Sequence, residues 1–525
     1  MRKWLGVLAL AGVLLLSACK DGKEAAQEAA AAAELTVLAG SELKDIEPLL
    51  PQIEAATGIR LKLHYAGTLD AVERLQDEGQ AYDFAWLASN KYALLTPAAK
   101  ARIRASERTM LSPVVIGIKT SVARTLGWAD AARPPSWADI ARACGEGRLR
   151  LAMTSPASSN TGFAAVLGLA SALAGKGEAL ELADIDFAAQ ARFARAQTVT
   201  AGSSGWLADT YVREEARLDG LVNYASVLQA LAPKLSEPLT LVYPKDGVIT
   251  ADYPFMLLRE ERRADYDRLV AYLRGKEFQQ AMTASTYRQP VHPEVQAAGS
   301  KTDYFELAFP ARLEVIDGLL DAYLHAVRRP ADSTFIVDVS GSMQGERIEQ
   351  LRKSLQGLAG ADSSLTGRYA RLRDRERIAL VRFSDHVEDQ QVWELGKDRQ
   401  RNDRQLQAFS DYAGQLQTTG GTAIYTAAKA AYEAALVRQH RDPDRTYTLL
   451  LMTDGKNNEG LSAKEFLAWF AALPPERQRI RIFAVRYGEA RSEELDALTQ
   501  PTGGRVFDAN KHGLQAAFKE IRGYQ

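Results

Sequence analysis

The stretch Thr334-Phe335-Ile336-Val337-Asp338-Val339-Ser340-Gly341-Ser342 decides the fold of the C-terminal part of this chain. Its first four residues are apolar or β-branched, and a short run of this kind predicts a buried strand. The following five residues carry one carboxylate and two hydroxyls at alternate positions. Such oxygens are the hard ligands that Mg²⁺, Mn²⁺ and Ca²⁺ prefer. The stretch therefore predicts a strand that ends in a cation site.

Two segments further along the chain supply matching oxygens. Gly420-Gly421-Thr422 opens a helical run and offers a third hydroxyl. Leu449-Leu450-Leu451-Met452-Thr453-Asp454-Gly455 predicts a second buried strand that ends in a second carboxylate. Ligands of doubly wound sheets bind at the carboxyl ends of the strands, which is where both carboxylates are expected.

The order Asp-x-Ser-x-Ser, then Thr, then Asp resembles the metal-ion-dependent adhesion site of von Willebrand factor type A domains. The resemblance implies that Ser340, Ser342 and Thr422 ligate the ion directly, and that Asp338 and Asp454 act directly or through water. The implied cofactor is a divalent cation, Mg²⁺ in first place, with Mn²⁺ or Ca²⁺ as alternatives. A carboxylate from a partner protein would take the free coordination position. The alternative is a domain that keeps these residues and binds no ion.

The resemblance also implies an α/β fold for residues 332–525, with a doubly wound, mostly parallel, Rossmann-like sheet. The pattern of the chain agrees with this expectation, because apolar runs alternate with helical segments. Strands are expected at residues 334–338, 378–383, 446–452, 480–487 and 505–507, with helices at 346–358, 422–437 and 463–472.

Length and charge narrow the class of protein. A chain of 525 residues is too long for one hydrophobic core, so two or three domains are expected. The 65 basic and 66 acidic side chains leave a net charge of −1, which offers no basic face for nucleic acid.

The pattern of the first residues predicts an export signal. A positive start and a short apolar stretch lead to Leu16-Ser17-Ala18-Cys19, an ending that resembles the lipobox of bacterial lipoproteins. The resemblance implies a signal peptide at 1–18, a lipid anchor on Cys19, and a location on a bacterial membrane facing the periplasm or cell exterior. Residues 19–34 then form an Ala/Glu-rich tether. An ordinary cleaved signal peptide or an uncleaved anchor is the alternative.

From residue 35 to about 300, strands alternate with helices as in βαβ units. The segments Thr36–Leu43, Ser112–Lys119 and Tyr272–Val291 resemble the two-lobed periplasmic solute-binding proteins of bacterial transporters. That resemblance implies a ligand held between the lobes by hydroxyls and backbone amides at helix N-termini, where unpaired N–H groups carry a partial positive charge.

Polar loops that follow the expected strands are the candidates for solute binding. A helix cap is the alternative role for each hydroxyl, because capping is what Ser and Thr usually do at helix starts. The candidate residues are Ser41, Ser89, Thr154, Ser155, Ser158, Thr161, Ser203, Ser204 and Tyr224.

Residues 301–331 predict a helix and linker that join the two halves. No phosphate-binding loop, zinc motif or nucleophile–base pair stands out, so we expect no enzyme activity. The sequence favours a membrane-anchored extracytoplasmic binding protein. Its C-terminal domain would bind a protein partner through a divalent ion, and its N-terminal region a small solute or a partner. The alternative is an ABC-type transport receptor in which the C-terminal domain is a docking module.

Overall fold

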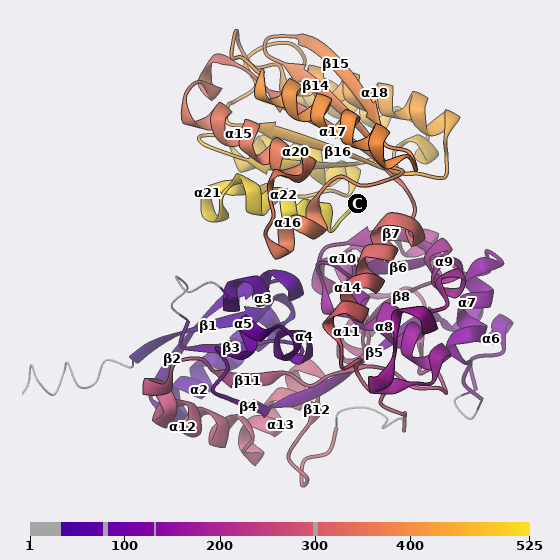
Figure 1. The fold of residues 1–525 in the computed structure, drawn as a ribbon, viewed down its shortest axis with the longest axis vertical. Helices are drawn as coiled ribbons and strands as arrows, with labels where there is room; N and C mark the ends of the chain where they lie inside the picture. The colour runs from indigo at the N-terminus through magenta and orange to yellow at the C-terminus, as the bar shows by residue number, and fades with distance from the viewer. Residues whose placement is uncertain (1–32, 77–81, 131–132, 298–302) are drawn as a thin grey trace, which may run out of the picture.

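The computed structural model describes residues 33–76, 82–130, 133–297 and 303–525, and these form two lobes and a C-terminal domain (Figure 1). The expected signal peptide at 1–18 and Cys19 lie outside the described residues. No helix among the described residues is long and apolar enough to cross a membrane. The predicted α/β fold class is confirmed.

The first lobe is built on a five-stranded sheet in the order β2-β1-β3-β11-β4. β1 is parallel to β2 and β3, whereas β11 runs antiparallel to β3 and β4. The strands are β1 (Ala33–Gly40), β2 (Ile59–Ala66), β3 (Phe84–Trp86), β4 (Ala105–Arg108) and β11 (Pro254–Leu257). The helices are η1 (Ser41–Leu49), α2 (Leu50–Thr57), α3 (Thr68–Gln76), α4 (Lys91–Leu95), α5 (Pro97–Lys100), α12 (Arg263–Leu273) and α13 (Lys276–Thr286).

The second lobe has a seven-stranded sheet with the path β10-β5-β8-β6-β7, and β9 and β12 also pair with β5. Its strands are β5 (Met110–Lys119), β6 (Leu151–Thr154), β7 (Gln197–Ala201), β8 (Gly220–Tyr224), β9 (Leu239–Val242), β10 (Thr250–Ala251) and β12 (Gln289–Pro290). Its helices are α6 (Thr120–Leu126), α7 (Trp137–Gly145), α8 (Asn160–Ala174), α9 (Phe187–Arg195), α10 (Ser204–Glu214) and α11 (Ala225–Leu231).

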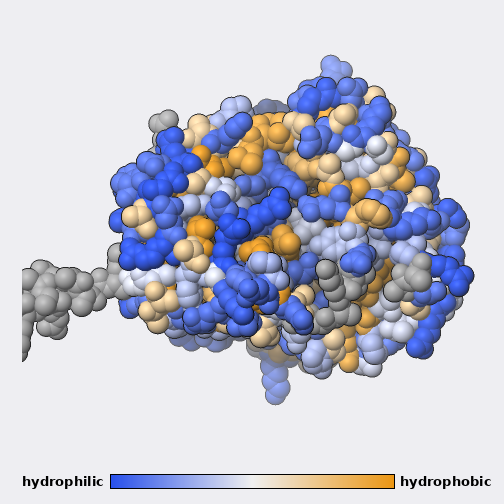
Figure 2. All heavy atoms as spheres, turned by 90° about the horizontal axis from the view of Figure 1, so that it is seen from below, coloured by the Kyte–Doolittle hydropathy of each residue, from blue (hydrophilic) through white to orange (hydrophobic). Residues whose placement is uncertain are grey.

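The chain crosses between the lobes after β4, after β10 and after α13. Two of these crossings hold residues in the left-handed region that favours glycine. Tyr253 has φ 41° and Tyr287 has φ 59°. On the face of the lobes that points away from the C-terminal domain, hydrophilic residues predominate, with apolar residues scattered between them (Figure 2).

The C-terminal domain has one six-stranded sheet in the order β15-β14-β13-β16-β17-β18, parallel except for β15. The strands are β13 (Ala331–Asp338), β14 (Arg377–Phe383), β15 (Val387–Glu394), β16 (Thr446–Thr453), β17 (Arg481–Arg486) and β18 (Val506–Asp508). The helices are α15 (Glu346–Gln356), α16 (Leu365–Ala370), α17 (Arg399–Gly414), α18 (Ile424–Arg441), α19 (Ala463–Ala471), α20 (Ser492–Thr499), α21 (Ala509–His512) and α22 (Leu514–Arg522).

Alternation along β13 explains why helices cover both faces of this sheet. Phe335 and Val337 join a core that includes Phe409 of α17 and Phe518 of α22. Ile336 points to the opposite core, built with α18, α19 and α20. Because successive side chains of a strand point to opposite faces, an unbroken apolar strand requires cover on both sides.

The C-terminal domain contacts both lobes, and α14 (Leu313–Ala322) leads into it from the lobes. The backbone and hydroxyl of Thr366 donate to the Glu73 carboxylate of α3, at 2.6 and 2.7 Å. On the second lobe, Arg481 of β17 pairs with Glu214 of α10. The two contacts place this domain across the line where the lobes meet.

Candidate functional sites

The carboxyl ends of β13 and β16 bring the first two predicted oxygens together. Parallel pairing sets Val337 beside Met452, so Asp338 and Thr453 are neighbours at the edge of the sheet. The Thr453 hydroxyl donates to Oδ2 of Asp338 at 2.5 Å, and the Ser340 amide donates to Oδ1 at 2.8 Å. These two bonds fix the Asp338 carboxylate at the base of the site.

The hydroxyls lie above this carboxylate. The Oγ atoms of Ser340 and Ser342 are 3.0 Å apart, and Ser342 donates to Oδ1 of Asp454 at 2.7 Å. A Cβ on Gly455 would lie 3.3 Å from Oγ of Ser342 and 3.4 Å from Oγ1 of Thr422. The absence of a side chain at Gly455 therefore leaves one small space that Thr422 and Ser342 both face.

Backbone bonds hold the loop before α18 against the turn after β13. The Gly341 amide donates to the Gly420 carbonyl at 3.1 Å, and the Thr419 amide donates to the Val339 carbonyl at 2.7 Å. Gly420 has φ 66°, which a residue with a side chain rarely adopts. The glycine thus lets this loop carry Thr422 to the site.

Burial gives the site its electrostatic character. Asp338 is fully buried and Asp454 is 1 % exposed, whereas Ser342 is exposed. Burial raises the pKa of Asp338 to about 6, and the nearby Asp454 carboxylate raises it further against the hydrogen bonds that lower it. Two buried carboxylates side by side favour a cation between or beside them.

The donor set fits a hard divalent cation. It comprises the side chains of Asp338, Ser340, Ser342, Thr422 and Asp454, and all of them are oxygen donors. Among the residues that the structure describes, no group of three or more His, Cys, Asp or Glu could hold a metal. A metal at this edge of the sheet would therefore depend on hydroxyl ligands.

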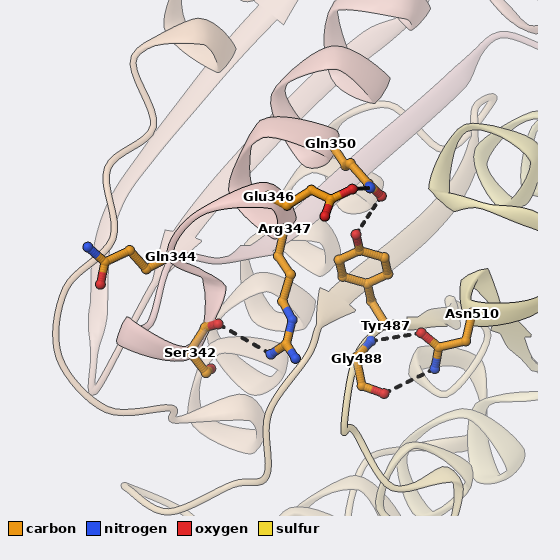
Figure 3. Close-up of a pocket in the computed structure, with 8 residues that line it drawn as sticks. All are labelled: Ser342, Gln344, Glu346, Arg347, Gln350, Tyr487, Gly488 and Asn510. Carbon is orange, nitrogen blue, oxygen red and sulfur yellow. Dashed lines mark hydrogen bonds between the residues drawn. The ribbon is translucent and has the colours of Figure 1, made fainter.

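The sequence analysis did not predict that an arginine side chain lies at this site. Arg347, in the first turn of α15, forms an ion pair with Oδ2 of Asp454 and donates to the Ser342 carbonyl at 3.3 Å. The guanidinium borders a pocket of about 530 Å³ next to the carboxylates (Figure 3). The pocket is lined by Ser342, Gln344, Glu346, Arg347, Gln350, Tyr487, Gly488 and Asn510.

In the second lobe, the predicted hydroxyls of Thr154 and Thr161 and the backbone of Ser155 and Ser158 are engaged with protein. The Oγ1 atoms of Thr154 and Thr161 are 2.8 Å apart, and Thr154 accepts from the Gly162 amide at 2.7 Å. Ser158 accepts from the Thr68 amide of the first lobe through its carbonyl, at 3.3 Å. The backbone amide of Ser155 donates to Ala201 at 2.9 Å. This loop ties β6, β7 and the first lobe together.

The remaining candidates lie where helices begin. Ser41 opens η1, and the Ser89 hydroxyl, two residues before the start of α4, accepts from the Lys91 amide at 3.3 Å. Ser203 precedes α10, and Ser204 is its first residue. Tyr224 ends β8 and is 1 % exposed.

A buried polar cluster between the lobes includes residues that the sequence did not single out. Arg288 is fully buried, pairs with Asp45 at 2.7 Å and lies 4.6 Å from the Tyr253 ring centre. Burial raises the pKa of Glu42 to about 7. Burial, followed by the Glu42 carboxyl, raises the pKa of Tyr224 well above its usual value. The cluster joins η1, the end of β8 and two crossings between the lobes.

The comparisons with known proteins agree with this two-part architecture. Residues 35–288 match the family described as bacterial extracellular solute-binding protein, and residues 332–520 match the von Willebrand factor type A domain. The chain therefore contains a bacterial solute-binding domain followed by a VWA domain. The family matched by residues 35–288 is described as extracellular, which fits the expected extracytoplasmic location.

Several solved structures that are similar to part of this chain are named as binding proteins. P5PA is 16% identical with a TM-score of 0.43, and the match covers 56% of this chain and 100% of that one. The ferric binding protein from Campylobacter jejuni is 16% identical with a TM-score of 0.41, covering 55% and 96%. A periplasmic thiamin binding protein is 15% identical with a TM-score of 0.43, covering 55% and 96%.

Curated relatives match short stretches. The uncharacterised protein sll0103 of Synechocystis is 28% identical over 141 residues, which is 26% of this chain and 28% of that protein. Calcium-activated chloride channel regulator 1 of Bos taurus is 31% identical over 107 residues, 20% of this chain and 11% of that protein. The chain thus spans under a third of the length of these relatives.

Proposed function

We propose that this chain is a lipid-anchored, non-enzymatic binding protein on the outer side of a bacterial membrane. Its VWA domain binds a protein partner through a divalent ion, and its two lobes bind a small solute. The observation that carries the proposal is the meeting of two buried carboxylates with three hydroxyls at one edge of the sheet. Nothing in the interior requires that arrangement, because apolar side chains would fill the edge at lower cost.

In this proposal the bound ion supplies a positive charge that faces solvent. Asp338, Ser340, Ser342, Thr422 and Asp454 would hold it. Asp338 is fixed by Thr453 and by the Ser340 amide, so its carboxylate needs little reorganisation to bind. Ser342 is exposed, and a partner carboxylate would approach from its side. Mg²⁺ usually keeps part of its coordination shell for water or for a second molecule, which leaves room for that carboxylate.

The second candidate function is that of an ABC-type transport receptor, with the VWA domain as a docking module. The match of residues 35–288 to a solute-binding family favours it. A stability screen of the full chain against small solutes tests the solute binding that both functions require, because a ligand that binds only the folded state raises the melting temperature. Metal-dependent capture of a protein partner separates the two functions, since only the leading proposal requires it.

The test of the leading proposal is affinity capture from native membranes with the full chain, in Mg²⁺ and in EDTA. We expect a partner that is retained in Mg²⁺ and lost both in EDTA and with Asp338→Ala. Asp385→Ala is the matched control, because Asp385 is an exposed aspartate next to Gly420. A partner that EDTA and Asp338→Ala leave in place would refute metal-dependent binding.

A further inference from the structure

The side chain of Arg347 contacts Asp454, one of the carboxylates that would hold an ion at this site. Its guanidinium pairs with Oδ2 of Asp454, while the Ser342 hydroxyl donates to Oδ1 of the same carboxylate. The Asp454 side chain is fully buried, and that of Arg347 is 33 % exposed. Both oxygens of Asp454 are thus engaged by protein groups, one of which carries a full positive charge.

The turn after β17 is shaped to admit this guanidinium. A Cβ on Gly488 would come within 2.9 Å of the guanidinium carbon, and Gly488 has φ 57°. In the close-up, Arg347 extends from α15 toward Ser342, in the gap beside Gly488 (Figure 3). The absence of a side chain at Gly488 therefore leaves space for the Arg347 guanidinium next to Asp454. An arginine that extends freely into solvent would not require such space.

A divalent ion and this guanidinium compete for the same carboxylate. Like charges repel, and the repulsion is weakly screened beside buried groups. Arg347 can leave Asp454 without leaving the site, because its side chain also borders the adjoining pocket, which Tyr487 and Asn510 line on the other side (Figure 3). From that pocket the planar guanidinium can bind a carboxylate with two parallel hydrogen bonds.

We propose that Arg347 is a tethered cation that holds Asp454 until a divalent ion displaces it, and that it then forms an anion-binding position in the adjoining pocket. The group it would receive is the carboxylate of an acidic partner residue. Arg347 would thereby set the ion affinity and the preference for acidic partners. This inference rests on the proposed metal-dependent function.

The test measures ion binding by the full chain with titration calorimetry, using Mn²⁺ and Mg²⁺. We expect Arg347→Met to bind Mn²⁺ about tenfold more tightly than the wild type, because a competing charge is gone. Arg347→Lys should lie between the two. The matched control is Lys353→Met, which removes one positive charge from an exposed position on the same helix.

A second readout follows the side chain itself. Labelling of Arg347 by phenylglyoxal, read by peptide mass spectrometry, should rise on adding Mg²⁺, while labelling of Arg438, which is paired with Asp332 and 13 % exposed, should not change. In Mg²⁺, acetate should raise the melting temperature of the wild type more than that of Arg347→Met. Equal Mn²⁺ affinities with unchanged labelling would overturn the role of Arg347 and leave the metal site standing. Absence of ion binding in both proteins would refute the metal site and this inference with it.

Discussion

Trp206 of α10 and Tyr524, just after α22, pack edge to face with ring centres 4.8 Å apart and planes at 83°. The pair crosses the boundary between the second lobe and the VWA domain. Tyr524 also fills the space over Gly202, where a Cβ would come within 2.4 Å of its ring. One apolar cluster includes Leu207 of the lobe and Phe483 and Phe518 of the VWA domain. The two folds therefore share part of a core.

We expect Tyr524→Ala to uncouple the two halves of the chain. Truncating a buried aromatic residue costs about 3–5 kcal/mol, and the edge-to-face pair adds about 0.5–1.5 kcal/mol. Calorimetry should resolve two thermal transitions in the variant, one for the lobes and one for the VWA domain. In the wild type the two transitions should overlap more closely. Tyr412→Ala, which removes a ring packed on Trp393 within the VWA domain, is the control. It should lower the stability of that domain without separating the transitions.

The VWA domain also contacts the first lobe, through Glu73. Besides Thr366, Lys519 of α22 pairs with Glu73 at 3.7 Å. Because Tyr524 follows the same helix, α22 bridges both lobes, and separating the lobes must break one of the two contacts. Tyr224 is 1 % exposed, so under the proposed solute-binding role a solute would reach it only after the lobes move, and solute access would then be linked to the docking of the VWA domain.

We expect Glu73→Gln to loosen the contact between the first lobe and the VWA domain. Hydrogen bonds to a charged group contribute about 1.5–3 kcal/mol, and the amide replaces one acceptor by a donor. Hydrogen exchange should increase in α3, α16 and the loop at residues 155–159. Glu54→Gln is the control, since Glu54 pairs with Arg60 on the exposed surface of the same lobe. Unchanged exchange in all three segments would show that Glu73 does not hold the lobes to the VWA domain.

Glu42 makes the stability of the lobes depend on pH. Burial raises its pKa from 4.5 to about 7, with Arg288 opposing and Asp45 adding to the shift. An acid whose folded pKa is raised binds more protons in the folded state, so stability falls as pH rises from about 4.5 to about 7. The upper bound of this loss is about 3 kcal/mol.

We expect Glu42→Gln to flatten that pH dependence, because the amide stays neutral throughout. Urea unfolding of the lobes between pH 4.5 and 7.5 is the measurement. Glu47→Gln, an exposed position on the same helix, should leave the slope unchanged. A slope that persists in Glu42→Gln would assign the titration to another group.

Sequence pattern pointed to Asp338, Ser340, Ser342 and Asp454 as candidate ligands because they lie at or just after the end of an apolar run that is easy to recognise. Thr422 was a candidate because it follows two glycines at the start of a helical run. The edge strand β15 was not predicted, since Val387–Glu394 is largely polar and reads as a loop. Arg347 was missed for a different reason. Its role depends on the direction of the first turn of α15 and on a glycine 141 positions later in the chain, which no local pattern connects.

The cluster between the lobes shows the same limit. Arg288 reaches the carbonyl of Glu42, 246 residues away, and the pairing depends on the return of the chain after α13. The sequence instead predicted solute binding by serine and threonine hydroxyls near helix starts. In the structure, the hydroxyls of Thr154 and Thr161 form a hydrogen bond with each other. A hydroxyl beside a helix start can form a hydrogen bond with a residue nearby in the sequence. The buried Arg288 instead binds groups that are far away in the sequence.

The final prediction concerns the ion. If the site binds Mg²⁺ only in the folded state, the ion stabilises the VWA domain by about 2.7 kcal/mol at a concentration one hundred times its dissociation constant. Mg²⁺ should therefore raise the melting temperature of the wild type, and EDTA should reverse the rise. Asp338→Ala should abolish the effect, because it removes the buried carboxylate that Thr453 and the Ser340 amide hold in place. Asp385→Ala should retain it. A rise that survives in Asp338→Ala would place the ion elsewhere on the chain.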